Sequence, residues 1–507
     1  MAVIPSPSLL LLRTRPSVLH LHLRLKSRYN PIRSIQTTQV PVIPNLVRIH
    51  PASNMATPWQ IRVPATDTGL LKWAQTEESA AKVSELLQKD LESHHVFFNA
   101  EGFHNHTVHL LLSLYATGAS PDVLDQAWAE NHSYQIKAMN THPDVVKELK
   151  SGWSADCPYL GKGKHYPDFL KFFQDEIEEK GWEKVLLEYV FKGDERSEAI
   201  FGRLFAGFLH PLIQLMYGIE WHQPAIVAEG LAQAAVHENR VGAFLTKVEQ
   251  AASSQSQSQS SQRRTPLPEL FESVRQYSEK LATSAQYGDS NKVYDGVFVR
   301  APDEALEFLK QIRVGEDELE ERLAEMVHSC AYVAATAAFH PPNTPKFDFF
   351  LIHHLNSSPF FVTLLSFDWL TPSQKARILE WKIRLDIVQY IARGCPPLRL
   401  DALKSFTPKD STVASVTKPE DLLSRFHEIL DDGHTIKVVR AFFIAQKLSQ
   451  KFADRPWIRI KDDETWLKMH QVLLQSTEGP QEPSLWVRSA GFDDAWQNVP
   501  KEADGKL

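Results

Sequence analysis

The sequence predicts an all-α fold, a large multi-helix domain arranged like a bundle. Apolar residues recur at helical spacing over most of the 507 residues. Alternating strand patterns are scarce, with 457–460 the best short candidate. The hydrophobic content of 43% is ample for a core, and no short period indicates a solenoid. We therefore expect helices packed around a shared interior.

The first 54 residues differ from the rest of the chain. They contain no Asp or Glu, and seven basic residues are spread among Leu, Ser and Pro: Arg13, Arg15, Arg24, Lys26, Arg28, Arg33 and Arg48. This composition is typical of an organellar transit segment. Alternatively, Met55 is the true start. In either case we expect residues 1–54 to be disordered and outside the fold, with a cytoplasmic protein, or a mitochondrial one if the segment is a transit peptide.

Residues 55–480 are expected to form the helical domain, interrupted by a disordered Ser/Gln-rich insertion at 252–264 and followed by an irregular tail at 481–507. Asn105 is a plausible N-cap for an apolar helix, and Pro121 stands at the first position of the next. The segment 140–167, rich in Gly, Pro and Lys, is expected to be a loop. The other expected helices cover 68–91, 168–180, 182–191, 197–219, 224–238, 267–281, 302–312, 316–339, 346–358, 372–392, 419–430, 435–452 and 465–476.

The helix expected at 197–219 is apolar almost all round, as a central buried helix should be. His210 lies in its middle, directly before Pro211. A proline inside a helix removes a backbone hydrogen bond and commonly kinks the helix. We expect a kink that frees space beside the preceding turn.

Composition excludes several classes of function. A net charge of −7, a pI near 6.3 and the lack of a basic stripe give no footprint for nucleic acid. No stretch reaches about 18 uninterrupted apolar residues, so we expect no membrane partner. Cys157, Cys330 and Cys395 form no CxxC pair, which removes a disulfide framework and a thiolate zinc site. Any metal would need nitrogen and oxygen ligands, and the chain has 21 histidines.

Several of these histidines lie inside apolar helical stretches. His106 and His109 are one turn apart, as are His434 and Lys437 at the start of a helix that follows the break at 431–433. A lone buried histidine is more often a core residue with a hydrogen bond than a ligand. Lys437 as a plain lysine, paired with a carboxylate at 431 or 432, is the corresponding structural alternative.

Four motifs in order resemble the questin oxidase-like family. They are Asn105-His106-Thr107-Val108 leading into 115–120, Phe208-Leu209-His210-Pro211-Leu212-Ile213 with 217–220, Lys346-Phe347-Asp348-Phe349-Phe350-Leu351-Ile352-His353, and Asp431-Asp432-Gly433-His434 to Lys437. The resemblance covers nearly everything from about residue 68 to residue 452. It implies an all-helical oxidoreductase of fungal polyketide metabolism that opens anthraquinone-type rings, described either as a Baeyer-Villiger oxidase or as a dioxygenase.

The resemblance also implies a mononuclear non-haem iron site between the central helices. Carried over by motif, its ligands are His106, His210, His353, His434 and a carboxylated Lys437. His109 and His354 are neighbours that could replace two of these histidines. Other nearby histidines are expected to support the site or the fold: His104, His237 and His340.

The chemistry of these residues agrees with that expectation. Imidazole suits iron, and an anionic oxygen ligand would offset the charge of a dication and leave one of six positions open. A lysine reacts with carbon dioxide only when neutral, and burial favours the neutral form. The expected cofactors are Fe(2+) with O2, with NADPH as a candidate reductant, and the expected substrate is a small aromatic polyketide. Aromatic residues could stack on its rings: Phe103, Tyr217, Trp221, Phe349 and Phe350.

Two rival functions stay open. One is an NADPH-dependent Baeyer-Villiger oxidase without bound metal, although the chain shows no dinucleotide-binding fingerprint. The other is a helical binding protein without chemistry. The sequence leaves the oligomeric state open.

Overall fold

The computed structural model describes residues 55–254, 264–429, 431–478 and 484–502. Over these residues the regular structure is helical, and β-type pairing is limited to isolated bridges. The predicted all-α class is therefore confirmed. The segment 1–54 and residues 255–263 of the insertion lie outside the described residues, so the expectations for them stay predictions.

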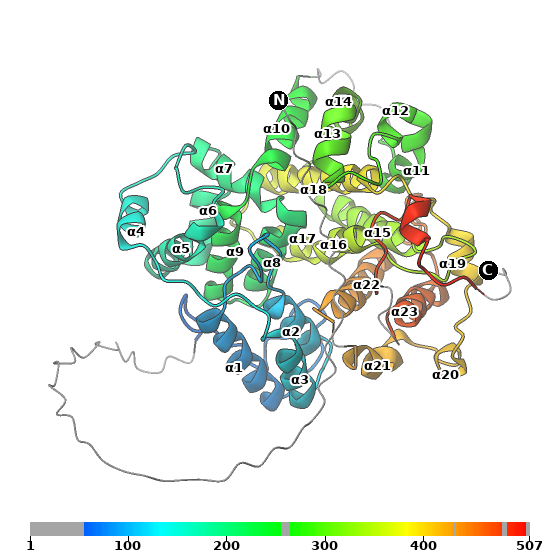
Figure 1. Ribbon diagram of the computed structural model, residues 1–507, viewed down its shortest axis with the longest axis horizontal. Coiled ribbons are helices and arrows are strands. Elements are labelled where there is room, and N and C mark those ends of the chain that lie inside the picture. The colour runs from blue at the N-terminus through cyan, green and yellow to red at the C-terminus, as the bar shows by residue number, and fades with distance from the viewer. Residues whose placement is uncertain (1–54, 255–263, 430, 479–483, 503–507) are drawn as a thin grey trace, which may run out of the picture. The chain divides into compact units, whose positions relative to one another are not determined.

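The α-helices follow one another along the chain as Figure 1 labels them. They are α1 (Glu77–Ser93), α2 (Thr107–Ala116), α3 (Pro121–Asn131), α4 (Pro143–Lys150), α5 (Tyr166–Lys180), α6 (Trp182–Tyr189), α7 (Glu195–Leu204), α8 (His210–Glu220), α9 (Pro224–Val236), α10 (Arg240–Ser253), α11 (Leu267–Tyr277), α12 (Glu279–Ala282), α13 (Phe298–Arg300), α14 (Pro302–Leu309), α15 (Leu319–Thr336), α16 (Phe349–Asn356), α17 (Pro359–Leu365), α18 (Pro372–Ala392), α19 (Leu400–Ser405), α20 (Ser411–Ala414), α21 (Leu423–His427), α22 (His434–Gln450) and α23 (Asp463–Thr477).

Several predicted boundaries were wrong. The first helix begins at Glu77 rather than 68, because Thr76 caps it by accepting a hydrogen bond from the Ser79 backbone N–H. The loop expected at 140–167 contains α4, which starts at a proline. The insertion begins later than 252, since α10 continues to Ser253. The helix expected at 419–430 is a 3-10 turn followed by α21, and residues 457–460 form no strand.

The helix predicted at 197–219 is broken rather than kinked. Between α7 and α8 the chain makes a short 3-10 turn, Gly207–Leu209, in which Phe208 and Leu209 have φ of 55° and 69°. Such left-handed backbone costs a non-glycine residue about 1–2 kcal/mol. Pro211 therefore stands in the first turn of a new helix, where it breaks no hydrogen bond, and His210 is the first residue of α8.

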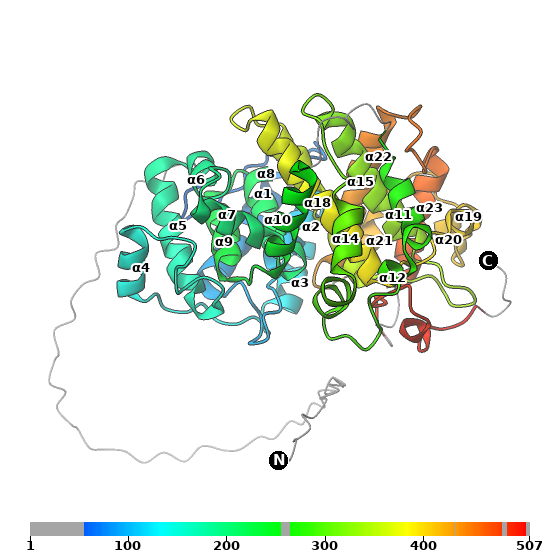
Figure 2. The ribbon, with the colours of Figure 1, turned by 90° about the horizontal axis from the view of Figure 1, so that it is seen from above.

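The helices gather into two groups that meet near the middle of the described domain. Figures 1 and 2 place α1–α9 on one side and most of α11–α23 on the other. In the first group α8 packs along α9, where a Cβ on Gly218 would lie 2.5 Å from the Val227 backbone nitrogen. In the second group α22 packs against α15 and α16. Contacts of α22 with α2 join the two groups.

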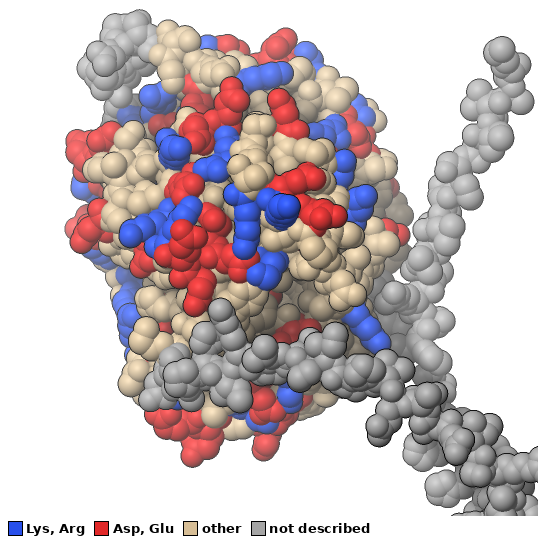
Figure 3. Space-filling model, turned by 90° about the vertical axis from the view of Figure 1, so that its left-hand side faces the viewer, with Lys and Arg blue, Asp and Glu red and all other residues tan. Residues whose placement is uncertain are grey.

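Lys and Arg are interspersed with Asp and Glu on the face in Figure 3, so this face offers no basic patch for a polyanion.

Among the described residues, no single helix is long and apolar enough to cross a bilayer. Only α7 joined to residues 207–220 passes on length and composition, as a pair bent by 69°.

Candidate metal centre

Four predicted histidines lie together where the two groups of helices meet. His106 is the N-cap of α2, and His210 and His434 are the first residues of α8 and α22. His353 lies within α16. Each imidazole contacts two others in a closed ring of side chains, with centroid separations of 4.9 Å (106 to 210), 5.0 Å (210 to 353), 4.8 Å (353 to 434) and 4.8 Å (434 to 106). We call this the histidine ring. All four members are buried.

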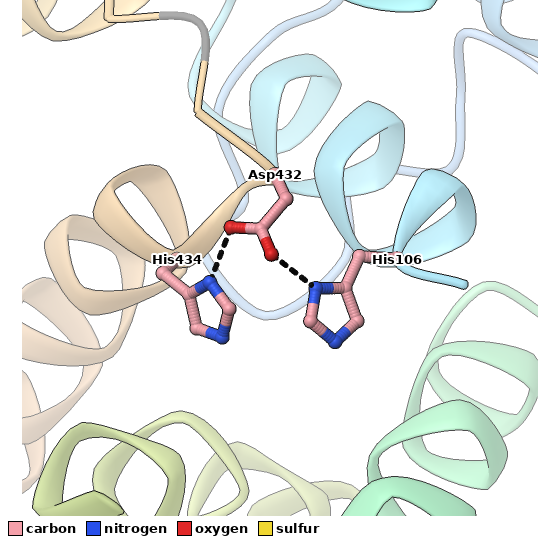
Figure 4. Close-up of side chains that lie close together, drawn as sticks. All are labelled: His106, Asp432 and His434. Carbon is pink, nitrogen blue, oxygen red and sulfur yellow. Dashed lines mark hydrogen bonds and ion pairs between the residues drawn. The ribbon is translucent and has the colours of Figure 1, made fainter. Parts of the chain in front are cut away.

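Every member of the histidine ring uses its Nδ1 atom to donate a hydrogen bond away from the others. His210 donates to the Gly207 carbonyl at 2.6 Å, and His353 donates to the Phe349 carbonyl at 2.5 Å. His106 and His434 both donate to the Asp432 carboxylate, at 3.0 and 2.5 Å (Figure 4). Carbonyl and carboxylate oxygens only accept, so each Nδ1 carries the hydrogen of a neutral ring.

The Nε2 atoms are consequently bare and face one another. The His106 and His210 Nε2 atoms are 2.7 Å apart, and those of His353 and His434 are 3.1 Å apart. Burial lowers the pKa of all four imidazoles, that of His434 to about 4, so none is protonated near neutral pH. Neither pair then has a hydrogen to share, and lone pairs at this distance repel unless a cation lies among them.

A metal ion fits these donors. Nitrogen ligands bind a first-row metal at about 2.0–2.1 Å, so adjacent ligands are about 3 Å apart, which matches both Nε2 separations. Metal-bound histidines usually donate the other N–H to a carboxylate or a carbonyl, and that contact fixes the ring orientation. All four members have such a partner. The donor set therefore has the form of a metal site with its supporting hydrogen bonds already made.

Asp432 ties the two groups of helices together behind the histidine ring. Burial acts to raise the pKa of Asp432, but the neighbouring imidazoles of His434 and His106, which donate hydrogen bonds to it, hold it well below its usual range. The residue also lies at the N-terminal ends of α2 and α22, where helix dipoles favour a negative charge. The sequence alone indicated Asp432 only as a candidate partner for Lys437.

Gly433 allows this close approach. It caps α22 with a φ of 88°, a conformation that favours glycine. A Cβ at this position would lie 2.9 Å from the Leu110 Cα atom of α2. The glycine in the Asp431-Asp432-Gly433 motif is therefore what lets the start of α22 pack against α2.

Lys437 lies one turn after His434 and is 2% exposed. Its Nζ atom has no hydrogen-bond partner among the described residues, so the alternative of a plain ion pair with Asp431 or Asp432 is not what the structure shows. Asp431 instead accepts hydrogen bonds from Gly433 and Thr435. Burial lowers the pKa of Lys437 to about 8, against the two aspartates. The amine is close enough to act on the pKa of all four ring histidines.

The two substitute histidines point elsewhere. The His109 Nε2 atom donates to the Gln214 side-chain oxygen at 2.8 Å, and Gln214 donates to Glu229, whose pKa burial raises to about 8. His354 donates from Nδ1 to Asp386 at 2.5 Å. Each is held by a core side chain outside the histidine ring, although the buried His109 Nδ1 atom has no hydrogen-bond partner among the described residues. These partners favour the histidines chosen by motif.

Of the other expected histidines, His104 supports the ring most directly. It stacks on His210 with 3.9 Å between centroids, and its Nε2 atom hydrogen bonds to that of His237 at 2.8 Å. His340 stacks on Trp496 instead, so its role is structural.

The aromatic residues expected at the site divide into those beside the histidine ring and those in the core. Phe349 contacts both His353 and His434, at 4.7 and 4.9 Å between centroids, and Phe350 contacts Phe349 at 5.3 Å. Tyr217 and Trp221 are fully buried, so they belong to the core and cannot stack on a substrate.

Comparison with known proteins gives the family. The sequence model described as "Questin oxidase-like" matches residues 103–442, a range that contains the whole histidine ring and Lys437. The chain belongs to the questin oxidase-like family. It is 35% identical to "Questin oxidase" of Aspergillus fumigatus, over 88% of this chain and 100% of that protein.

Other members of the questin oxidase-like family carry related names. "Baeyer-Villiger oxidase ptaJ" of Pestalotiopsis fici is 36% identical over 83% of this chain and 94% of its own. "Oxidoreductase AflY" of Aspergillus parasiticus is 32% identical over 88% of this chain and 94% of its own. The predicted resemblance is confirmed, and the chain is an oxidoreductase.

Proposed function

We propose that this oxidoreductase is an iron-dependent oxygenase that cleaves a carbon-carbon bond of an aromatic polyketide, an anthraquinone-type ring opening. The observation that carries the proposal is the closed ring of four imidazoles with every Nδ1 on an acceptor and the Nε2 atoms facing each other. His106, His210, His353, His434 and Lys437 would hold the metal. When bound, iron would supply activation of O2 for the oxidation.

Lys437 is proposed to act as a carboxylated residue. Its neutral amine would add to carbon dioxide, forming an N–C bond and releasing one proton, and the product is an anionic carbamate. Burial without a hydrogen-bond partner supports this, because it favours the neutral amine and leaves the Nζ atom free to react. The carbamate would bring a negative charge to a site whose other four donors are neutral.

The rest of the site holds these donors in place. Asp432 fixes the ring planes of His106 and His434, while the turn at 207–209 fixes His210 through the Gly207 carbonyl. Phe349 covers one side of His353 and His434 and limits the access of water. Such packing keeps ligands in a fixed geometry.

The substrate class is proposed from the relatives and from aromatic side chains beside the histidine ring. One relative is named for questin and others as Baeyer-Villiger oxidases. Phe349 and Phe350 are half-buried next to the ring and offer faces to a flat polycyclic molecule. We propose that the protein works in the cytoplasm from a start at Met55, and in the mitochondrion if residues 1–54 are a transit peptide.

A second candidate is favoured by the names of the relatives. A Baeyer-Villiger oxidase inserts one oxygen atom beside a carbonyl and reduces the other to water with two electrons from NADPH. That reaction would not need the histidine ring as a metal site.

Oxygen uptake on an anthraquinone substrate separates the candidates. We expect uptake that stops when the metal is chelated and returns on adding ferrous iron. Uptake that requires NADPH and survives chelation would favour the second candidate. Replacing His210 or His434 by Ala tests the alternative of a binding protein without chemistry. That alternative predicts that both variants bind the ligand as the parent does and that the parent itself has no activity.

A further inference from the structure

Phe208 presents a partly exposed aromatic ring on the turn that leads into His210. It is two residues before His210, is 37% exposed, and lies 4.8 Å from Phe350 between centroids. Its φ of 55° and that of Leu209, 69°, are both left-handed. The backbone therefore adopts an unfavourable conformation that leaves a large apolar side chain partly in water, which is unusual for a residue with only a packing role.

Arg488 reaches the same aromatic pair from the C-terminal segment 484–502, outside the part of the chain that the family match covers. Its guanidinium stacks on Phe349 at 4.5 Å from the ring centroid. The side chain is exposed, and among the described residues it forms no hydrogen bond or ion pair. Its N–H groups are thus available to a ligand.

The backbone around Arg488 is held firmly. Asp348, the N-cap of α16, accepts hydrogen bonds from the backbone N–H groups of Ser489 and Ala490 at 2.6 and 2.8 Å. The Phe349 backbone N–H donates to the Val487 carbonyl at 2.8 Å. The start of α16 therefore fixes the position of Arg488 relative to His353 on the same helix.

A neighbouring arginine shows what a purely structural stack looks like here. Arg393 lies over Phe350 at 4.1 Å, is 3% exposed, and donates to the Ser489 hydroxyl. Arg488 forms the equivalent stack on Phe349 but keeps its donors in solvent. The two stacks lie side by side, because the rings of Phe349 and Phe350 are 5.3 Å apart.

The charges around Arg488 point to an anionic partner. Asp348 and Asp432 are the carboxylates whose charges act on Arg488. Both carboxylates are already engaged, by backbone N–H groups and by the two histidines. A planar oxyanion that stacks on the aromatic surface would meet an arginine with unused donors, the geometry in which guanidinium groups bind best.

We propose that Arg488 and Phe208 are specificity-determining residues that bind the aromatic substrate against Phe349 and Phe350, beside the histidine ring. Arg488 pairs with an ionised phenol oxygen, and Phe208 with Phe350 stacks on the fused rings. The assignment rests on the proposed function for the identity of the substrate, but its test measures binding and needs no turnover.

Binding of two probes separates the two contacts. We use 2-hydroxyanthraquinone at a pH where its hydroxyl is ionised, and 2-methoxyanthraquinone, which cannot ionise. R488Q should weaken binding of the hydroxy probe about tenfold, as expected for one charge-assisted hydrogen bond, and leave the methoxy probe unchanged. R488K should fall between. The control is R455Q: Arg455 pairs with Glu321 and lies beyond the far end of α22, about 25 Å along the helix from His434.

Phe208 is tested by F208G and F208A with the same probes. Both should weaken the two probes equally, because stacking does not depend on the charge. F208G should also raise or keep the thermal midpoint, since glycine tolerates the left-handed φ. This combination excludes misfolding as the cause of lost binding.

Several outcomes would overturn the proposal. They are an R488Q variant that weakens neither probe or both alike, an F208G variant that binds as the parent does, and a parent protein that binds neither probe. Metal content, measured on the same samples, keeps the two proposals apart. Charge-selective binding without metal would refute the iron enzyme and leave the proposed role of Arg488 supported. Bound iron together with unchanged probe binding by R488Q would support the iron enzyme and refute the role of Arg488.

Discussion

The histidine ring and a second histidine cluster show how the same residue types can serve different purposes. In the second cluster, His142 and His165 both direct Nδ1 at one oxygen of buried Asp168, at 3.0 and 2.8 Å. Asp168 also accepts the His142 backbone N–H at 2.6 Å. Here every contact has one donor and one acceptor, so these contacts are complete, and they tie the start of α4 and the turn before α5 to Asp168 in α5.

The histidine ring has the same kind of outer contacts but an inner side that is not complete. Its Nδ1 atoms donate outward to Asp432 and to carbonyls, and its Nε2 atoms then face one another without hydrogens. The difference teaches that proximity of histidines and a carboxylate does not identify a metal site. The direction of the hydrogen bonds does, because it decides which lone pairs are left to share.

The largest expected contrast is between H210A and H165A. H210A removes one bare Nε2 atom, so bound metal and activity should fall to background. H165A removes a satisfied donor and should keep both, with a lower thermal midpoint. Metal analysis and oxygen uptake on both variants provide the measurement, and loss of metal in H165A alone would reverse the assignment of the two clusters.

Lys437 gives the next largest effect. K437M should weaken metal binding by more than about a hundredfold, since loss of even an outer partner costs 10–100-fold. K437E should recover part of it by supplying a carboxylate oxygen. Protein labelled with 13C-bicarbonate should show a carbamate signal in NMR that is absent from K437M. Full metal content in K437M would show that the lysine is no ligand.

Replacing Asp432 or Asp168 should have smaller effects than replacing Lys437. One replacement should lower metal affinity, and the other should lower folding stability. D432N leaves one of two histidines without an acceptor and should lower metal affinity 10–100-fold. D168N should cost about 1–3 kcal/mol of folding stability, the penalty for unsatisfied buried groups, and leave metal affinity unchanged. Metal titrations and denaturant unfolding distinguish them. Equal effects on metal affinity would mean that Asp432 does not orient the histidine ring.

The last prediction concerns acid. Burial lowers the pKa of His470 and of His237 to about 4, from 6.5. As pH falls, the unfolded chain takes up protons first, so these groups contribute stability that is complete above about 6.5 and lost as pH falls to about 4. Unfolding free energies of metal-free protein should decline over this window. A flat profile would contradict neutral buried histidines.

Sequence reasoning found the ring histidines and Lys437 through four motifs, but not their geometry. It could not separate His106 from His109 by spacing, because both lie on one face of α2. The partner that separates them, Gln214, is on α8, more than 100 residues away in the chain. Asp432 was visible two residues before His434, yet its link to His106 depends on how α22 packs against α2.

Part of the helix content was predictable from local sequence. Long periodic stretches such as α18 (Pro372–Ala392) were predicted at their observed bounds, because local spacing and a proline at the first turn define them. The break at 205–209 was not, since it depends on left-handed conformations of Phe208 and Leu209 that propensity disfavours. Gly207, with a φ of 52°, was the one local signal. The role of Arg488 was also hidden, because its segment has no regular pattern.

The central claim is that four histidine Nε2 atoms and Lys437 hold one metal ion, and elemental analysis of freshly purified protein tests it most directly. The account predicts about one iron per chain in the parent protein and in H165A, and none in H210A. A parent protein without a stoichiometric transition metal would contradict it.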